Sequence, residues 1–178
     1  MLPFSSLTEL DVSGCAALTT LYVYDNQLTE LDVSGCAELT SLYVSGNSLK
    51  KLNVSGTALT TLNCGARAYF NGVYVYGQDL TTLESLDVSG CTALTTLGVY
   101  NNQLTELDVS GCAALTSLYV SGNPLKILNV SGTALKTLDF SDSWSNQYLT
   151  TLEWLDASGC SALTSLSVSG KVPSKGEN

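Results

Sequence analysis

The chain repeats one 21-residue phrase almost unchanged, and this repetition constrains its fold more than any other feature. Residues 7–27 read LTELDVSGCAALTTLYVYDNQ, and residues 28–48 read LTELDVSGCAELTSLYVSGNS. A single unit of this length cannot bury its own leucines, whereas stacked units share one continuous core. The sequence therefore predicts a solenoid in which each unit forms one coil. About seven coils are expected, and they start at Leu7, Leu28, Leu49, Leu83, Leu104, Leu125 and Leu152.

Each half-coil carries the pattern of a short strand with one buried face. In the motif LxxLxV, apolar residues such as Leu10 and Val12 alternate with polar ones, and this period of two is typical of a β-strand. Apolar residues make up 44% of the 178-residue chain, which is enough for a packed core. No apolar run approaches the ~20 residues of a membrane helix. The fold class is therefore predicted to be a mainly β repeat solenoid with parallel strands and little or no helix.

A longer period lies above the coil. Residues 7–65 and 83–141 align with 47 identities in 59 positions, and each block holds three coils with an insertion in the third. Superrepeats of three coils are therefore predicted to start near residues 4, 80 and 149.

The solenoid is assigned to residues 1–171, with insertions near residues 66–79 and 142–148, and residues 172–178 are interpreted as a polar tail or linker. Neither end carries the polar cap that an exposed solenoid end needs. The chain is therefore expected to continue in a longer array or to be covered at its ends by another chain.

The phrase falls within the leucine-rich-repeat pattern, in which units of about 20–29 residues end in Asn or Cys. Over residues 7–170 the chain resembles leucine-rich-repeat proteins, and its short coils are most similar to those of bacterial internalin J-like surface proteins. Those proteins place a cysteine inside the strand, where this chain has valine except at Cys64. The resemblance implies a horseshoe or arc, a protein partner on the concave strand face, and an extracellular or cell-surface location in a bacterium. No signal peptide is recognisable in the chain itself.

Two corner positions of the coil recur with constant chemistry. An amide side chain at the first can bond backbone groups that no strand ladder satisfies, in its own coil and in its neighbour. A small thiol or hydroxyl at the second can be buried beside them. The first position is held by Asn26, Asn47, Asn102 and Asn123, and the second by Cys15, Cys36, Cys91, Cys112 and Cys160, with Thr57 and Thr133 in the other complete coils. Because Thr replaces Cys and the spacing is a full coil rather than CxxC, buried reduced thiols are favoured over disulfides or a metal site.

Tyrosines are expected to project from the half-coil that ends in YV. They stand among Ser and Thr on the side opposite the buried Leu and Val, which offers large contact area at little entropy cost. These candidate binding residues are Tyr22, Tyr24, Tyr43, Tyr100 and Tyr119. The alternative is that the rings only stack and stabilise neighbouring strands. The resemblance favours binding. This half is taken as the concave face, and the half that ends in DV is the alternative, which fits almost as well.

Two insertions carry further aromatic residues. The first, GARAYFNGVYVYGQD, predicts a hairpin, because Asn71-Gly72 suits a tight turn between strand-forming residues. The second contains SDSWSNQY. Because they follow equivalent coils, both are expected to leave the same edge of the solenoid roughly 14 Å apart, and either to bind a partner or to fold back over the core edge. The candidate residues are Tyr69, Phe70, Tyr74 and Tyr76 in the first insertion and Trp144 and Tyr148 in the second.

Carboxylates form a stripe along the half-coil that ends in DV. Every third coil has Asn53 or Asn129 instead of Asp, which is expected to relieve repulsion between carboxylates stacked ~5 Å apart. A solvated face that keeps the array soluble is the favoured interpretation, and a basic partner or calcium is the alternative. The sequence DVSGC matches no calcium-loop motif. The stripe consists of Asp11, Asp32, Asp87, Asp108 and Asp156, flanked by Glu9, Glu30 and Glu106.

Composition argues against several functions. The net charge is −9 with only seven Lys and Arg, so binding to nucleic acid or insertion into a membrane is not expected. Histidine is absent, and no nucleophile, phosphate-loop or zinc motif is present. The chain is therefore predicted not to be an enzyme, and no cofactor or metal is expected.

The function predicted from these features is a protein–protein interaction module of a bacterial surface or secreted protein. It would bind a protein partner, which the sequence does not identify, through the exposed tyrosines and the aromatic edge loops. One alternative is a structural spacer or a repeat segment that self-associates through uncapped ends. The other is a carbohydrate-binding surface.

Overall fold

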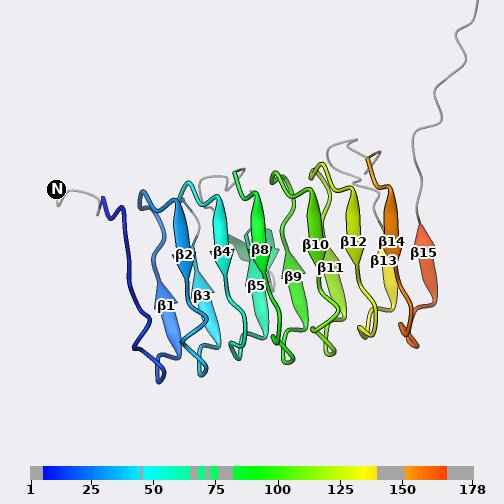
Figure 1. The fold of residues 1–178 in the computed structure, drawn as a ribbon, viewed down its shortest axis with the longest axis horizontal. Helices are drawn as coiled ribbons and strands as arrows, with labels where there is room; N and C mark the ends of the chain where they lie inside the picture. The colour runs from blue at the N-terminus through cyan, green and yellow to red at the C-terminus, as the bar shows by residue number, and fades with distance from the viewer. Residues whose placement is uncertain are drawn as a thin grey trace, which may run out of the picture.

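The computed structural model describes residues 6–44, 46–64, 68–70, 73–75, 82–139 and 151–167. Within these ranges the chain forms strands of three residues each and no helix. Figure 1 shows the coils side by side in one row that ends at β15. Neighbouring coils pair through parallel strands. The predicted mainly β solenoid is confirmed.

From the second coil on, one strand of each coil lies on a surface that we call the DV face, after the motif that ends its half-coil. The first coil forms no strand there, contrary to the pattern of Leu10 and Val12. Two three-stranded sheets form this face, in the orders β2-β4-β8 and β10-β12-β14, and β8 lies against β10. The strands are β2 (Glu30–Asp32), β4 (Lys51–Asn53), β8 (Ser85–Asp87), β10 (Glu106–Asp108), β12 (Ile127–Asn129) and β14 (Trp154–Asp156).

The other strand of each coil lies on the opposite surface, the YV face. Its sheets have the orders β1-β3, β5-β9-β11 and β13-β15. The strands are β1 (Thr20–Tyr22), β3 (Ser41–Tyr43), β5 (Thr61–Asn63), β9 (Thr96–Gly98), β11 (Ser117–Tyr119), β13 (Thr137–Asp139) and β15 (Ser165–Ser167).

Equivalent residues of successive coils lie opposite each other. Leu31 pairs with Leu52, and Leu52 pairs with Leu86. The second step spans 34 residues rather than 21. The first insertion therefore leaves the coil without interrupting the ladder.

That insertion contains β6 (Ala68–Phe70) and β7 (Val73–Val75), which pair in antiparallel fashion. Tyr69 lies opposite Tyr74 in this pair. The predicted hairpin is confirmed, and its two strands form a sheet separate from those of the solenoid.

The core is a continuous stack of leucines and valines between the two faces. Leu49, Leu104 and Leu125, which each begin a coil, are fully buried. The central leucine of β2, β4 and β10 also points inward between two outward-facing residues. Each such side chain contributes roughly 1.5–3 kcal/mol on burial, so several of them hold each coil to its neighbours.

Where a coil has the asparagine, this side chain closes the coil, and from the second coil on it also ties the coil to the preceding one. Asn47 Oδ1 accepts the N–H of Leu28 at 3.0 Å. Asn47 Nδ2 donates to the carbonyl of Val44 at 2.9 Å and, in the preceding coil, to that of Val23 at 2.7 Å. Asn123 makes the equivalent three bonds. One side chain thus satisfies three backbone groups that the strand ladders leave unpaired.

The cysteine ladder packs against backbone carbonyls. Cys91 Sγ donates to the carbonyl of Val54, in the preceding coil, at 3.1 Å. Thr57 occupies the same position in that preceding coil, and its hydroxyl donates to the same carbonyl at 2.8 Å. The Thr57 hydroxyl also lies 3.6 Å from Cys91 Sγ. Both side chains thus find a valine carbonyl at this corner, Thr57 in its own coil and Cys91 in the preceding one.

All six cysteines are free. Cys36, Cys91 and Cys112 are buried as expected, and Cys160 is half-buried. Cys15 is exposed, contrary to the expectation for the ladder. In later coils the carbonyl under the thiol comes from the preceding coil, and Cys15 belongs to the first coil.

Native-state alkylation should separate these thiols. Burial raises the pKa of Cys64 to about 12, so almost none of this thiol is in the reactive thiolate form at pH 8. We expect iodoacetamide at pH 8 to modify Cys15 first and to leave Cys64 unmodified until the chain unfolds, as read by peptide mass spectrometry. Equal labelling rates at the two positions in the folded protein would contradict the burial of Cys64.

Candidate functional site

Three tyrosines form a contiguous exposed group on the YV face of the first two coils. Tyr22 and Tyr43 lie opposite each other in β1 and β3, with ring centroids 4.6 Å apart and planes 6° apart. Tyr24 packs edge-on against Tyr22, with centroids 6.5 Å apart. The exposed fractions of Tyr22, Tyr24 and Tyr43 are still 65%, 56% and 44%. The rings of this tyrosine cluster stack, as expected if they stabilise neighbouring strands, and they also keep the exposed surface that partner binding requires.

The other two tyrosines of the YV face are separate from the cluster. Tyr119 is exposed and lies opposite Gly98 rather than another ring. Tyr100 stands two residues beyond β9 and is half-buried, so it projects less than expected. The Tyr100 ring lies beside Gly98, where an added Cβ would lie at an ordinary contact distance of 3.6 Å from Cε1 of Tyr100. Burial raises the pKa of the Tyr100 phenol, and a hydrogen bond with Asn63 opposes this increase.

The aromatic residues of the insertions are only partly located. Tyr69, Phe70 and Tyr74 stand on the β6–β7 hairpin. Tyr76, Trp144 and Tyr148 lie outside the described residues, so their placement at the solenoid edge stays a prediction.

The acidic stripe of the DV face shapes the turn after each strand. Asp32 Oδ1 accepts the N–H of Ser34 at 2.9 Å, and Asn53 Oδ1 accepts that of Ser55 at 3.0 Å. This Asx turn was not predicted, although the constant spacing of Asp or Asn two residues before Ser is its sequence signal. The same bond is made by Asp11, Asp87, Asp108 and Asp156.

The asparagine that interrupts the stripe bonds its acidic neighbour. Asn53 Nδ2 donates to Asp32 Oδ2 at 3.3 Å, and Asn129 repeats this bond with Asp108. The interruption thus replaces a contact between two carboxylates by a hydrogen bond, as predicted. The backbone N–H and the hydroxyl of Ser34 lower the pKa of Asp32, with a smaller contribution from Asn53 that offsets part of the burial effect.

The Asp32→Asn variant should therefore lose acid sensitivity without losing neutral stability. The pKa of Asp32 is lowered below 3.8 in the folded chain, so its contribution to stability is present above 3.8 and disappears as the pH falls through the lowered value. Because Asn53 forms the same turn, the free energy of unfolding at pH 7 should change by no more than about 0.5 kcal/mol. Urea titrations at pH 7 and pH 3 should show a smaller loss for the variant than for the wild type. A larger loss in the variant would contradict the assigned role of the carboxylate.

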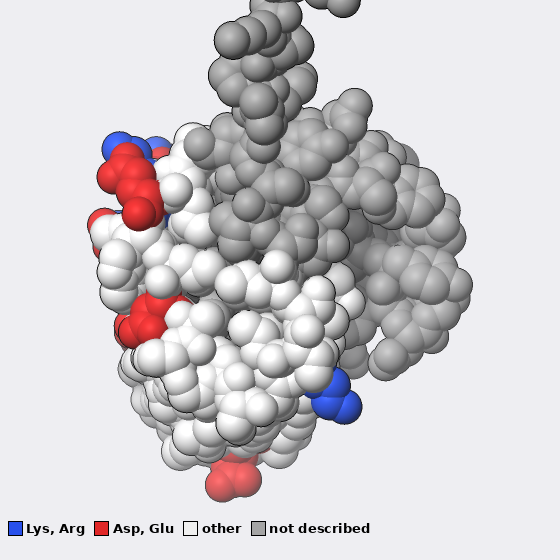
Figure 2. Space-filling model, turned by 90° about the vertical axis from the view of Figure 1, so that its right-hand side faces the viewer, with Lys and Arg blue, Asp and Glu red and all other residues white. Residues whose placement is uncertain are grey.

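The lysines on the DV side are paired with glutamates. Lys51 Nζ lies 3.0 Å from Glu30, and Lys50 Nζ lies 3.3 Å from Glu84. Lys126 forms a longer pair with Glu153, at 3.6 Å. All are exposed and contribute little to stability, but they reduce the positive charge available on this side. The end-on view in Figure 2 shows acidic side chains gathered along one side of the solenoid.

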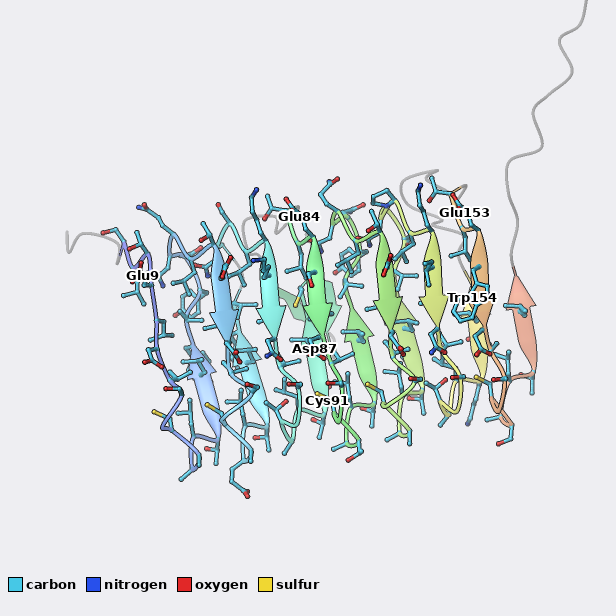
Figure 3. All side chains as sticks on the ribbon, viewed as in Figure 1. Glu9, Glu84, Asp87, Cys91, Glu153 and Trp154 are labelled. Atoms are coloured by element: carbon cyan, nitrogen blue, oxygen red, sulfur yellow. The ribbon has the colours of Figure 1, made fainter. Side chains whose placement is uncertain are left out.

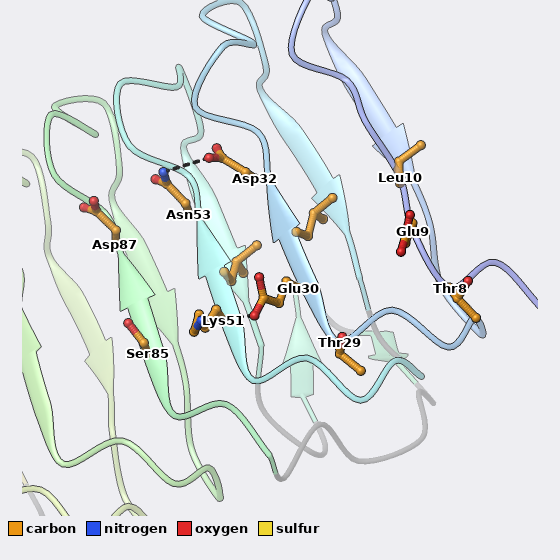
Figure 4. A pocket seen from close by; sticks show the side chains of 12 residues that line it. Thr8, Glu9, Leu10, Thr29, Glu30, Asp32, Lys51, Asn53, Ser85 and Asp87 are labelled. Carbon is orange, nitrogen blue, oxygen red and sulfur yellow. Dashed lines mark hydrogen bonds and ion pairs between the residues drawn. The ribbon is translucent and has the colours of Figure 1, made fainter.

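A groove of about 620 Å³ lies on the DV face over the first four coils. Its rim and walls include Glu9, Glu30, Asp32, Lys51 and Asp87. Figure 4 shows these side chains around the opening, with Asn53 bonded to Asp32. The hollow therefore lies on the face opposite the tyrosine cluster.

Sequence analysis did not single out two exposed apolar residues of the DV face. Trp154 is 49% exposed, and Ile127 lies opposite it in the neighbouring strand and is 38% exposed. Figure 3 shows Trp154 on β14, several coils beyond Asp87. The available signal was the departure from the repeat, because Glu30 and Glu106 hold the same strand position in other coils.

Among the described residues, no group of three or more His, Cys, Asp or Glu side chains could hold a metal ion. In the same part of the chain, no helix is long and apolar enough to cross a membrane.

The sequence was compared with protein-family models and with known proteins. A family model described as "Leucine Rich repeat" matches residues 79–101. No curated relative matches the sequence.

Two solved structures are similar to the chain. One is the functional domain of InlJ from Listeria monocytogenes, described as including a cysteine ladder, with 23% identity over 92% of this chain and 49% of that chain, and a TM-score of 0.31. The other is YopM, a leucine-rich effector protein from Yersinia pestis, with 19% identity over 92% of this chain and 63% of that chain, and a TM-score of 0.26. The chain thus spans about half the length of the first and less than two thirds of the second.

The matched residues 79–101 contain β8 and β9, the two strands of the fourth coil. Coils of the same construction precede and follow it, joined by parallel strands in constant register. The asparagine and cysteine ladders run through the same coils. The chain is therefore a solenoid of repeated coils with a cysteine ladder, and its fourth coil matches the leucine-rich-repeat family model.

Proposed function

We propose that this chain is the partner-binding part of a bacterial surface or secreted protein, and that it binds a protein through the tyrosine cluster. Leucine-rich-repeat solenoids are in general protein-interaction modules. The location is supported by the resemblance of the short repeats to internalin-like surface proteins. Binding, rather than catalysis, is the role that we assign to the chain.

The observation that carries the proposal is the geometry of Tyr22, Tyr24 and Tyr43. Parallel stacking and an edge contact fix the rings, while about half of each side chain stays exposed. A contact surface that is ordered before binding loses little conformational entropy when a partner docks. Tyrosine also supplies both apolar area and a hydrogen-bonding hydroxyl.

The aromatic edge loops are the second part of the proposed surface. Tyr69 and Tyr74 lie opposite each other on a hairpin that leaves the stack after the third coil. Isolated Tyr119, half-buried Tyr100 and the insertion residues Phe70, Tyr76, Trp144 and Tyr148 are assigned supporting contacts.

The test compares binding of the wild type and the Tyr22→Ser/Tyr43→Ser variant to a panel of purified bacterial and host extracellular proteins. Serine is a conservative replacement within this repeat, because the equivalent position of β15 is Ser167. A true partner should bind the variant at least about tenfold more weakly, the loss typical of buried aromatic anchors. Thermal melts should confirm that the variant stays folded.

Tyr119→Ser is the comparison variant, since it removes an exposed ring on the same face that lies outside the cluster and is assigned only a supporting contact. Its effect should stay within about twofold. A protein partner that binds the cluster variant as tightly as the wild type would contradict the proposed surface. A glycan panel in the same experiment tests the carbohydrate alternative.

A further inference from the structure

The groove on the DV face is open to solvent, and one of the strand positions that line it has a short side chain. Ser85, with its short side chain, lies in β8 opposite Lys51 of β4. In the next superrepeat the same positions hold Trp154 of β14 and Ile127 of β12, again opposite each other. The chain therefore has small and polar side chains at the groove, where its own later repeat has a large indole and an isoleucine.

The charge of the groove is strongly negative. Four carboxylates line it, from Glu9, Glu30, Asp32 and Asp87, against the single ammonium group of Lys51. That ammonium group is already paired with Glu30 at 3.0 Å. Of the three remaining carboxylates, Asp32 accepts hydrogen bonds from Ser34 and Asn53, both of which preserve its charge.

The groove also contains neutral hydrogen-bonding groups. Thr8, Thr29, Ser85 and Asn53 line it between the carboxylates. It extends over four coils, or three strand spacings of ~4.8 Å, which is the length of about four residues of extended peptide. Its volume of about 620 Å³ is sufficient for long side chains from such a segment.

We propose that this groove binds an extended, arginine- or lysine-rich segment of a protein partner. Charge complementarity selects the occupant, because the lining has an excess of three negative charges in a chain whose net charge is −9. Guanidinium groups suit carboxylates in particular, since they can donate two parallel hydrogen bonds to one carboxylate. This surface lies on the face opposite the tyrosine cluster, so it is independent of the function proposed above.

Isothermal titration with an acetylated tetraarginine amide tests the proposal, with a tetraglutamate peptide and spermine as comparison ligands. Tetraarginine should bind the wild type, more weakly at high salt, while tetraglutamate should not bind. Ser85→Trp should weaken tetraarginine binding at least about tenfold without changing the net charge, because it gives the groove the residue that β14 has at this position.

A matched pair of charge variants distinguishes tetraarginine binding in the groove from non-specific attraction of a cationic peptide to the acidic chain. Asp87 lines the groove and Asp156 does not, yet both are strand-end residues that make the same Asx turn. Asp87→Asn should weaken tetraarginine binding about threefold to tenfold, and Asp156→Asn by less than about twofold. The Tyr22→Ser/Tyr43→Ser variant should bind tetraarginine like the wild type.

Four outcomes would overturn the proposal. They are no binding of tetraarginine at millimolar concentration, unchanged binding by Ser85→Trp, equal losses in Asp87→Asn and Asp156→Asn, and spermine binding as tight as that of tetraarginine with the same dependence on the variants. The third would show attraction to the acidic chain as a whole, and the fourth would show recognition of charge without a peptide. Circular dichroism of each variant confirms that its fold is retained.

Discussion

Replacing Asn102 by alanine is expected to lower the free energy of unfolding by about 2–6 kcal/mol, from two buried backbone groups at roughly 1–3 kcal/mol each. The Asn102 side chain is fully buried between the third and fourth coils. Its Oδ1 accepts the N–H of Leu83 at 3.0 Å, and its Nδ2 donates to the carbonyls of Cys64 and Val99 at 2.9 and 3.0 Å. Alanine would remove the partner of the Leu83 N–H and of the Cys64 carbonyl in a site that water does not reach, whereas the Val99 carbonyl would still accept a hydrogen bond from Asn123 Nδ2. Urea denaturation followed by circular dichroism measures the loss.

Asn26→Ala is the matched control for this prediction. Asn26 makes the corresponding bond to Leu7 at 3.1 Å and donates to the carbonyl of Val23 at 3.2 Å, but it is only half-buried in the first coil. Because water can replace the lost partners, its cost should be about 1 kcal/mol. Equal losses in the two variants would show that burial does not set the strength of the asparagine ladder.

The second large effect is expected at Gly122, whose replacement by alanine should cost about 2–4 kcal/mol, from left-handed strain and a steric clash. Gly122 has φ +73, and a Cβ at this position would collide with Oδ1 of Asn101 in the preceding coil. Asn101 is itself in the left-handed region, with φ 56, a conformation that asparagine tolerates better than most residues. The side chain of Asn101 therefore fills the space between the two turns, and position 122 of the next coil has no room for a side chain. Chemical denaturation measures the cost.

Gly132→Ala separates the two contributions. Gly132 has a similar φ of +70, but the nearest atom to an added Cβ is a carbonyl oxygen 4.0 Å away. Only the backbone strain of about 1–2 kcal/mol should remain. In addition, Asn101→Gly should recover part of the loss caused by Gly122→Ala, because it removes the colliding side chain. A double variant as unstable as Gly122→Ala alone would contradict the steric explanation.

The asparagine and cysteine ladders were predictable because each depends on a position that every coil repeats. The corner of the coil leaves backbone N–H and C=O groups unpaired, so the same type of side chain is used to hydrogen-bond them wherever the corner recurs. Cys15 was the exception for the same reason. Its sequence position is equivalent to that of Cys36, but only Cys36 has a preceding coil whose Val12 carbonyl accepts the thiol.

The candidate sites were less predictable, because they depend on contacts between coils that differ. Tyr24 and Tyr100 stand at the same position of the repeat, yet Tyr24 is exposed and Tyr100 is half-buried beside Gly98. The acidic stripe was interpreted as a solvated face, while its Asp side chains also form the turns. The spacing of Asp two residues before Ser is compatible with an Asx turn, but only the hydrogen bonds in the structure show that the turn forms.

The sequence by itself determined the solenoid, its coil length, its strand positions and its buried ladder residues, because stacking repeats every local environment at a fixed interval. Only the tertiary structure decided where the surface is hollow and which rings touch. Those features arise at strand positions that vary along the solenoid, where Ser85 lies beside Lys51 and where Tyr22 stacks on Tyr43 while Tyr119 lies opposite Gly98. A repeat pattern specifies what is the same in each coil, whereas a binding surface is made of the differences, whose effect depends on three-dimensional contact.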